Sequence, residues 1–477
     1  MKLAGWISLV LITLSVAVWH YGEYRYTNED SPAKTSIPCR IQGYAYEITC
    51  GHLEVADQEN TSRPLSNEIR WYRIPARSRY GMPDPVIWIP GFGIDAEERA
   101  PAMASILKRI MNTRDLIWLM PRGTPRTDKD ACMKAGIKTL NEHLNPLSDN
   151  DLLERCQGFM AEHVGSYSSA ELYAHDLEQL RVKLNLDQVN VLAEGSGAEV
   201  ALRWMQLSPD AIRVTVLDSP VLIESAKPEL RASRSESALR QAFSACVETS
   251  ECALEHTDPY VNLQRVLMGL PRTLDIVNPQ TSVPESVHVT RENLAGLMTR
   301  ILSHPPRAAM LPTAVYEAAN GNWNPLFGLY EATLPAPNKT FHWEVWLAAY
   351  CSRHSAGPGV LESDLASWFY SAERDQFHRL CGEDLPQMTP IDSMSFDSPV
   401  LVLRGGADPI VSDLPFDVHE VRVPGGGHGI LTYGCASDVI YRFIQSNGAA
   451  IQDSGLGAGC LEQVPYPLPL QNIGRKQ

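Results

Sequence analysis

The chain has 477 residues, of which 44% are hydrophobic, so it is long enough for a large core and a second, smaller unit. Its formal net charge is −15, and no long run of lysine and arginine interrupts the acidic background. This charge balance argues against nucleic acid as a partner.

Residues 1–22 are predicted to be a targeting segment. Lys2 is followed by uncharged, mostly apolar sequence up to residue 19, and polar sequence comes next. Small residues at Ser15 and Ala17 favour a secretory signal that is cleaved after Ala17. The aromatic Trp19 and Tyr21 favour a membrane anchor instead, and both interpretations stay open. Either one predicts export, to the periplasm, the extracellular space or the outer side of a membrane.

The ten cysteines also fit an exported protein, because they fall as close neighbours along the chain. An oxidising compartment would join them as five sequential disulfides, each closing a local loop. Metal binding is the rival interpretation, but the chain has no CxxC or HxxxH spacing, so we expect no metal and no cofactor. The predicted pairs are Cys39 with Cys50, Cys132 with Cys156, Cys246 with Cys252, Cys351 with Cys381, and Cys435 with Cys460.

After a polar, disulfide-tied extension over residues 23–65, apolar runs alternate with helical patterns. A capping-box pattern from Ser168 to Glu171 begins one of these helices. The alternation predicts an α/β fold with a mostly parallel sheet, right-handed crossovers and helices on both faces. The expected strands in this part are 85–90, 115–120, 189–192 and 214–217. The expected helices are 96–111, one that follows the capping box and has apolar positions 172, 177 and 180, and 198–206.

From residue 224 to residue 394 the alternation stops, and proline-broken helical sequence predicts an inserted cap. Strands are expected again at 399–403 and 418–423, followed by a closing helix over 436–445. The predicted organisation is therefore a core composed of residues 66–223 and 395–477, interrupted by a mainly helical cap over 224–394.

Two polar residues directly follow the last two predicted strands. Asp408 lies in the sequence RGGADP, and His428 lies in GGGHG. Either residue alone is an ordinary loop residue. Together, twenty residues apart and each after a strand, they have the chain order of the acid and base of a Ser-His-Asp triad. The acid would hold the imidazole in one tautomer and stabilise the imidazolium.

Further motifs carry a resemblance to a family. RGT at 122–124 follows a strand, YSS at 167–169 is followed by Asp176, Leu177 and Arg181, and cysteine pairs stand at the start of the cap and near the C-terminus. Over about residues 85–470 the chain resembles the exported α/β hydrolases of the tripeptidyl aminopeptidase and proline iminopeptidase type. The resemblance implies an α/β-hydrolase fold with an inserted helical cap. It also implies an envelope peptidase or related serine hydrolase that acts on small peptides or acyl groups.

The match fails at the nucleophile. The family's elbow has the sequence G-x-S-x-G, which occurs nowhere in this chain. An ungapped match of the flanking strand and helix places AEGSG (193–197) on the five positions, so Gly195 stands where the serine is expected. Ser196 comes one residue later, where the family uses a backbone N–H as an oxyanion donor. If Ser196 were the nucleophile, Glu194 would occupy a position that must be small, and the side chain would be re-aimed by about a quarter turn.

Other positions leave further alternatives. The family's GGPG oxyanion loop is PGFG (90–93) here, and its DQRG is MPRG (120–123), which lacks the acid. Asp218, after the strand over 214–217, is an alternative triad acid. In the cap, Glu317 and Glu331 could bind a substrate amine, but solvated helix faces are the plainer interpretation, and we assign no binding residue there.

Three hypotheses about function follow. The first is a serine-type hydrolase of small peptides or acyl compounds, with Ser196, Asp408 and His428 as catalytic residues. The second is an inactive homologue that keeps the cavity between core and cap for binding or as a scaffold. In the third, Asp408 and His428 activate water directly, which would be slow because losing the nucleophile of such a triad lowers kcat by about 10⁶ in a well-studied protease.

Overall fold

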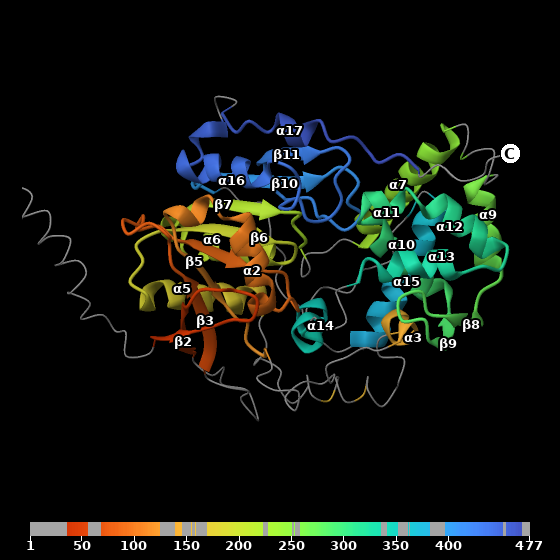
Figure 1. The fold of residues 1–477 in the computed structure, drawn as a ribbon, viewed down its shortest axis with the longest axis horizontal. Helices are drawn as coiled ribbons and strands as arrows, with labels where there is room; N and C mark the ends of the chain where they lie inside the picture. Colours follow the sequence, from red (N-terminus) through yellow and green to blue (C-terminus); the bar gives the residue numbers. More distant parts are fainter. Residues whose placement is uncertain are drawn as a thin grey trace, which may run out of the picture.

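The computed structural model has an α/β core beside a mainly helical cap (Figure 1). It describes residues 36–55, 68–124, 139–145, 169–222, 228–249, 258–334, 341–351, 363–381, 396–451 and 455–469, with the single positions 154, 158, 252 and 361. The predicted targeting segment lies outside the described residues. No helix within the described ranges is long and apolar enough to cross a membrane.

A nine-stranded sheet forms the centre of the core, in the order β1-β2-β3-β5-β4-β6-β7-β10-β11. The strands from β5 to β11 in this order are parallel, and the three before them are antiparallel. Their bounds are β1 Ser36–Cys39, β2 Ile48–Glu54, β3 Glu68–Ile74, β4 Val86–Ile89, β5 Leu116–Leu119, β6 Val189–Glu194, β7 Ile212–Asp218, β10 Val400–Gly405 and β11 His419–Val423. This mostly parallel sheet with helices on both faces has the α/β-hydrolase fold, as predicted.

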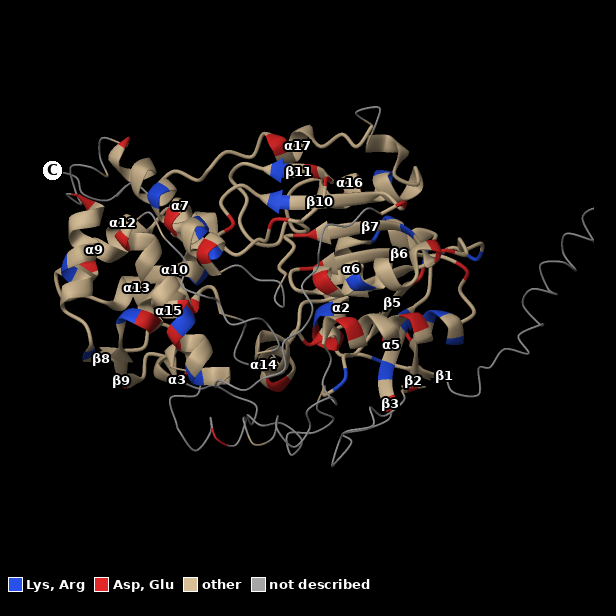
Figure 2. Cartoon of the chain, turned by 180° about the vertical axis from the view of Figure 1, so that it is seen from behind, with Lys and Arg blue, Asp and Glu red and all other residues tan. Residues whose placement is uncertain are grey.

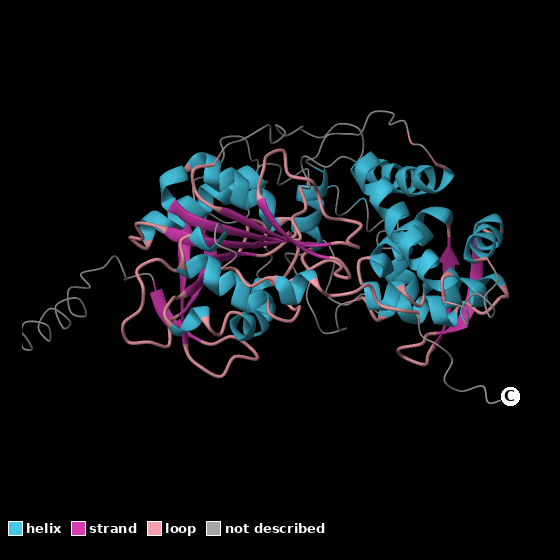
Figure 3. Ribbon diagram, turned by 90° about the horizontal axis from the view of Figure 1, so that it is seen from above, coloured by secondary structure: helices cyan, strands magenta, loops and turns pink. Residues whose placement is uncertain are grey.

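Helices cover both faces of the sheet (Figure 3). Alternate residues of a strand point to opposite faces, so Trp88 and Trp118 pack on one face while Ile87 and Ile117 pack on the other. Strands buried on both sides have the continuous apolar runs that identified them in the sequence. The first face is covered by α2 (Ala96–Ile106) and α16 (Ala436–Gln445), and the second by α5 (Ala170–Lys183) and α6 (Gly197–Leu207).

Two motifs of the predicted resemblance meet in a buried ion pair. The Nε and one Nη of Arg122 donate hydrogen bonds of 2.7 Å each to the two carboxylate oxygens of Asp176, whose side chain is fully buried. Such a two-pronged pair fixes geometry as well as adding energy. Helix α5 begins one residue later than the capping-box pattern indicates, because Ser169 is its N-cap and accepts a hydrogen bond from the Leu172 N–H.

The N-terminal extension continues the main sheet instead of standing apart. Strands β1 and β2 pair with each other, β2 pairs with β3, and a disulfide between Cys39 and Cys50 joins the first two strands. The extension therefore adds antiparallel strands to one edge of the parallel sheet.

The cap forms a hydrophobic core of its own. Its elements are α7 (Pro228–Val247), α9 (Pro259–Met268), β8 (Arg272–Val277), β9 (Pro284–Val289), α10 (Arg291–Leu302), α11 (Pro305–Ala308), α12 (Leu311–Ala319), α13 (Asn324–Glu331), α14 (Trp343–Cys351) and α15 (Asp364–Cys381). The predicted cap is thus mainly helical, and the pair β8-β9 is a separate antiparallel sheet.

Two short helices do not pack where the predicted domain boundaries place them. One lies within the predicted core and packs into the cap, and the other lies within the predicted cap and packs on the sheet. Helix α3 (Leu140–Leu144) belongs in sequence to the first part of the core, yet Leu140 and Leu144 pack into the hydrophobic core of the cap. Helix α14 belongs in sequence to the cap, yet Val345 and Ala349 pack into the sheet's second face. Figure 1 shows α14 between the two units.

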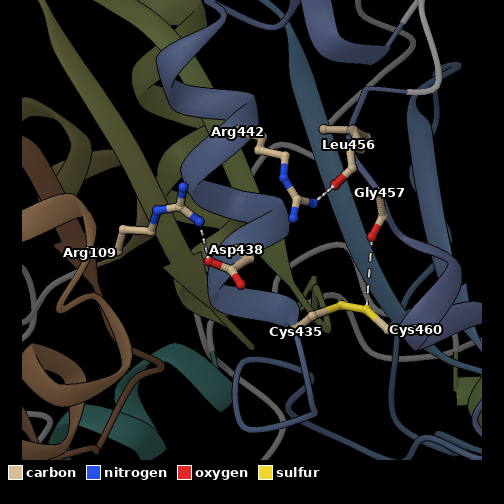
Figure 4. Close-up of a disulfide and its surroundings, with 7 residues drawn as sticks. All are labelled: Arg109, Cys435, Asp438, Arg442, Leu456, Gly457 and Cys460. Carbon is tan, nitrogen blue, oxygen red and sulfur yellow. Dashed lines mark hydrogen bonds and ion pairs between the residues drawn. A yellow bond between two sulfur atoms is a disulfide. The ribbon is translucent and has the colours of Figure 1, made fainter.

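Four of the five predicted disulfides are present: Cys39 with Cys50, Cys246 with Cys252, Cys351 with Cys381, and Cys435 with Cys460. The fifth predicted pair, Cys132 and Cys156, lies outside the described residues. Figure 4 shows the last disulfide tying the start of α16 to α17 (Gly459–Glu462), while Arg442 of α16 donates a hydrogen bond to the Leu456 carbonyl. Disulfides of this kind form in an oxidising compartment.

Gly197 allows α6 to start very close to β4. A Cβ built on Gly197 would lie 2.4 Å from the carbonyl oxygen of Ile89 and 2.7 Å from that of Pro90. We expect Gly197→Ala to lower the free energy of unfolding by about 1–3 kcal/mol, because backbone must shift to admit the methyl group.

Urea unfolding of the oxidised protein measures this effect. Gly296→Ala in the middle of α10 is the matched control, because a Cβ there meets nothing within 4 Å and should stabilise the helix by about 0.5–1 kcal/mol. Equal unfolding free energies for the two variants would show that the close approach at Gly197 is not a constraint.

Candidate functional site

The candidate site lies where the parallel strands end, the usual place for ligands in α/β sheets. The carboxyl end of β7 supplies Asp218, and the loops after β4, β6, β10 and β11 supply Phe92, Gly195, Asp408 and His428. A cavity of about 780 Å³ lies between these loops and the cap and contacts residues of both. A cavity of this size fits a small molecule or a short peptide.

The structure brings the predicted acid and base together. His428 Nδ1 lies 2.9 Å from Asp408 Oδ2, and the Asp408 side chain is completely buried. The other oxygen, Oδ1, accepts a hydrogen bond from the Ile410 N–H at 3.0 Å. The cap also holds the base, since the His428 N–H donates to the Ser303 carbonyl oxygen at 2.8 Å. His428 therefore turns its Nε2 atom to the cavity while Nδ1 faces the carboxylate.

Several groups act on the pKa of His428. Burial lowers this pKa, but the adjacent Asp408 carboxylate raises it, and Asp218 and Glu194 add to that effect, so the pKa lies above its usual value. An imidazole with this environment can accept a proton at Nε2 and keep it while a reaction proceeds.

Gly195 lies at the tip of the turn from β6 to α6, with His428 facing it, as the sequence register predicts. Its φ angle is +51°, in the left-handed region where glycine is favoured. A Cβ built on Gly195 would lie 3.5 Å from His428 Nε2 and 3.9 Å from Cε1. The space in front of the imidazole is thus where a side chain at position 195 would stand.

The structure does not bring Ser196 to His428. Ser196 is the N-cap of α6 and is 9% exposed, and its Oγ accepts a hydrogen bond from the Phe92 N–H at 2.8 Å. Among the hydrogen bonds of the described residues, none joins Ser196 to His428. The Ser196 hydroxyl is therefore the acceptor for the backbone N–H of the loop after β4. Its role as nucleophile stays an untested prediction, and this geometry does not favour it.

The Phe92 side chain belongs to the hydrophobic core on the sheet's second face, and the residue also lines the cavity. It is 4% exposed and packs into the sheet's second face, with its centroid 6.4 Å from that of Tyr173. The altered PGFG loop consequently keeps a backbone N–H directed at the elbow. Met120, where the family has an acid, is buried in the core on the first face.

Asp218, the alternative triad acid in the sequence, holds a loop instead of the imidazole. Its two carboxylate oxygens accept hydrogen bonds from the N–H groups of Ile430 and Leu431, at 2.7 and 3.1 Å. The neighbouring Ser219 hydroxyl accepts the Gly429 N–H at 2.9 Å. Burial, with the nearby Glu194, raises the pKa of Asp218 to about 6. Asp218 and Ser219 therefore hold the loop after His428, and Asp408 is the carboxylate hydrogen-bonded to the imidazole.

Glu194 is a site residue that sequence reasoning did not assign. Its Oε2 accepts hydrogen bonds from Trp88 Nε1 at 2.8 Å and Arg99 Nε at 3.1 Å, and Arg99 also pairs with Oε1. The aromatic residue in β4 and the arginine in α2 give no joint signal in sequence, because only the fold brings them to the end of β6. This cluster holds the residue that precedes Gly195 and so helps to fix the turn.

The two cap carboxylates weighed from the sequence lie away from the cavity. Glu331 is buried and accepts a hydrogen bond from Asn278 Nδ2 at 2.7 Å, while Glu317 accepts one from Asn322 Nδ2 at 3.0 Å. Neither contacts the cavity. Among the residues that the structure describes, no group of three or more potential metal ligands is assembled.

Comparison with known proteins gives a likeness at the level of the fold. No family model matches the chain, and no curated protein matches it. Similar solved structures include a proline iminopeptidase-related protein from Thermus thermophilus, with 14% identity, 87% of this chain and 98% of that chain covered, and a TM-score of 0.34. An esterase from Thermogutta terrifontis has 13% identity over 84% and 98%, with a TM-score of 0.31. An α/β-hydrolase-fold protein from Nakamurella multipartita has 12% identity over 87% and 99%, with a TM-score of 0.30.

Proposed function

We propose that this chain is an exported hydrolase of small acyl compounds in which water, not a serine, attacks the substrate. The observation that carries the proposal is the position of His428 Nε2, which faces the space above Gly195 while Asp408 holds Nδ1. Because glycine has no side chain, a water molecule can occupy the space that a serine hydroxyl would take. The four disulfides support export, and the predicted targeting segment agrees with it.

The proposed reaction is general-base hydrolysis. His428 Nε2 takes a proton from the water as its oxygen bonds to the carbonyl carbon of an ester or amide, and Asp408 stabilises the imidazolium. The developing oxyanion accepts hydrogen bonds from the Ser196 N–H and from the Ser196 hydroxyl, whose oxygen accepts the Phe92 N–H. When the intermediate collapses, the bond to the leaving group breaks and His428 gives that group its proton. The products are a carboxylic acid and an alcohol or amine.

In this scheme Ser196 donates hydrogen bonds to the oxyanion. Gly195 stands at the position where related hydrolases have the nucleophilic serine. The resemblance to exported aminopeptidases supports a small peptide or aminoacyl compound as the substrate. Turnover should be slow, since water replaces a nucleophile whose loss lowers kcat by about 10⁶ in a serine protease. Nucleic acid is not expected as a partner.

Loss of the base should abolish most of this activity. We expect His428→Ala to lower the hydrolysis of small esters by about 10²–10⁴, the usual contribution of a general base. The rate of the unchanged protein should rise with pH through a pKa above 6.5, because only neutral imidazole takes a proton. Asp408→Asn should lower the rate and move this rise to lower pH, because it removes the carboxylate that raises the pKa.

Covalent labelling separates this mechanism from the serine-type alternative. A fluorophosphonate probe should leave the intact mass of the purified protein unchanged, because within the described ranges no hydroxyl is hydrogen-bonded to the His428 ring. Adduct formation at Ser196 would overturn the water mechanism and make Ser196 the nucleophile. Ester hydrolysis unaffected by His428→Ala would overturn it as well.

One observation favours the non-catalytic alternative. The Ser196 hydroxyl already accepts the Phe92 N–H, the backbone donor that an oxyanion would otherwise use. If acyl compounds bind in the cavity and none is hydrolysed above the rate of the His428→Ala variant, the chain is a binding protein with a hydrolase fold.

A further inference from the structure

We propose that the cavity selects acyl compounds whose leaving group carries a carboxylate, and that Arg300 binds this carboxylate. The inference rests on the proposed function for the position of the reacting carbonyl. It adds a substrate class and a specificity residue that the triad geometry does not contain.

Arg300 is a cationic residue of the cavity wall whose partners are neutral. It lies in the last turn of α10, its side chain is exposed to the cavity, and its Nε and one Nη donate to the Oγ1 and carbonyl oxygen of Thr333 at 3.2 and 3.1 Å. In the described part of the chain, no carboxylate lies within ion-pair distance of Arg300. Burial lowers its pKa, and the phenol of Tyr330 opposes this only in part.

Two other arginines of the same wall pair with carboxylates, and a further one, Arg379 of α15, also lines the cavity. Arg99 pairs with Glu194, and Arg231 of α7 pairs with Glu373 of α15 at 3.0 Å. Figure 2 shows acidic and basic positions close together on α7 and α15. Arg300 faces the cavity with hydrogen bonds to Thr333 and, among the described residues, without a carboxylate partner. A planar carboxylate is the group that a guanidinium binds through two parallel hydrogen bonds.

The two histidines beside Arg300 leave this charge uncompensated. Burial lowers the pKa of both His143 and His304, and the charge of Arg300 lowers it further. Both imidazoles line the cavity. The lowered pKa of each imidazole favours its neutral form, so neither histidine supplies a carboxylate or other anion to Arg300.

The position of Arg300 fits the leaving-group side of the reaction. Ser303 accepts the backbone N–H of His428, and Arg300 precedes Ser303 by three residues of helix, which is roughly 4.5 Å along the axis. Arg300 and His428 both line the cavity, so a substrate that spans them places its carboxylate on Arg300 and its leaving group beside His428, the residue that gives this group its proton.

An aromatic wall covers the acyl side. Phe341 packs on the loop after β4, where a Cβ built on Gly93 would lie 2.5 Å from its ring, and Trp346 stacks on Tyr350 with centroids 4.6 Å apart. All three aromatic residues line the cavity. The arrangement fits an apolar or aromatic acyl group on this wall, a carbonyl over Ser196, and a carboxylate at Arg300.

Hippurate tests the inference, because it joins a benzoyl group, an amide and a carboxylate, and hippuramide is its uncharged match. Calorimetric titration with the full-length oxidised protein should show that hippurate binds at least tenfold more tightly than hippuramide. Arg300→Gln should weaken hippurate binding by about ten- to a hundredfold, the value of charged hydrogen bonds, and change hippuramide binding less than twofold. Arg291→Gln, at the start of the same helix and away from the cavity, is the control and should change neither.

The inference would be overturned if the protein bound hippurate and hippuramide equally well, or did not bind hippurate. It would also be overturned if the Arg300→Gln variant bound hippurate with unchanged affinity. These results are separable from the proposed function. Arg300-dependent binding without hydrolysis would refute the reaction alone, whereas His428-dependent hydrolysis that ignores Arg300 would refute the carboxylate site alone.

Discussion

Gly195→Ser is expected to create a covalently reactive serine beside His428. The new Cβ would stand 3.5 Å from His428 Nε2 and 3.9 Å from His428 Cε1, so the hydroxyl comes within reach of the base with little rearrangement. Asp408 already orients the imidazole. We therefore expect fluorophosphonate labelling at position 195 and a rise of at least about 10²-fold in ester hydrolysis, a small part of the roughly 10⁶ that a full triad nucleophile contributes.

The serine must adopt the backbone that glycine has here. A φ of +51° is unfavourable for a residue with a Cβ, so the variant should lose about 1–3 kcal/mol of stability. Gly195→Ala is the matched control, because it carries the same strain without a hydroxyl and should remain unlabelled. Labelling at Ser196 in the unchanged protein, with none at position 195 in the variant, would show that the register of the turn is wrong.

The sequence identified the elements that local pattern and chain order determine. Asp408 and His428 follow buried strands, and parallel strands bring their ends to one edge, so their meeting was predictable. Gly195 and Gly197 were placed by register alone, and the close contact of Gly197 with the Ile89 carbonyl explains why the turn tolerates no other alignment. The pairing of the described cysteines was predictable as well, because each pair joins segments that are close along the chain.

What the sequence could not predict depends on where side chains meet in space. The bond from the Phe92 N–H to the Ser196 hydroxyl joins residues more than a hundred positions apart. The carboxylate of Asp218 holds the His428 loop across an even longer stretch of sequence. The same reason explains α3 and α14, whose apolar residues were visible in sequence while the hydrophobic core that each joins was not.

Ser196→Ala should have opposite effects in two backgrounds, which tests the role proposed for this hydroxyl. In the natural chain, the hydroxyl stands in front of the Phe92 N–H, 2.8 Å away, and in the proposed reaction it is the donor to the oxyanion. Without the hydroxyl, the Phe92 N–H is too far from the oxyanion to donate a hydrogen bond to it. We therefore expect ester hydrolysis to fall about ten- to a hundredfold, somewhat less than the loss of a full oxyanion donor.

In the Gly195→Ser background, the acyl carbon bonds to the new serine, and its oxygen must enter the space between the Ser196 N–H and the Phe92 N–H. The Ser196 hydroxyl occupies that space. Adding Ser196→Ala should therefore raise the rate of fluorophosphonate labelling about ten- to a hundredfold, because both backbone donors become available. Ser235→Ala, a buried serine in the cavity wall on α7, is the control and should change neither rate. A fall in both backgrounds would mean that the hydroxyl only supports the turn, and a rise in both would mean that it only obstructs the oxyanion site.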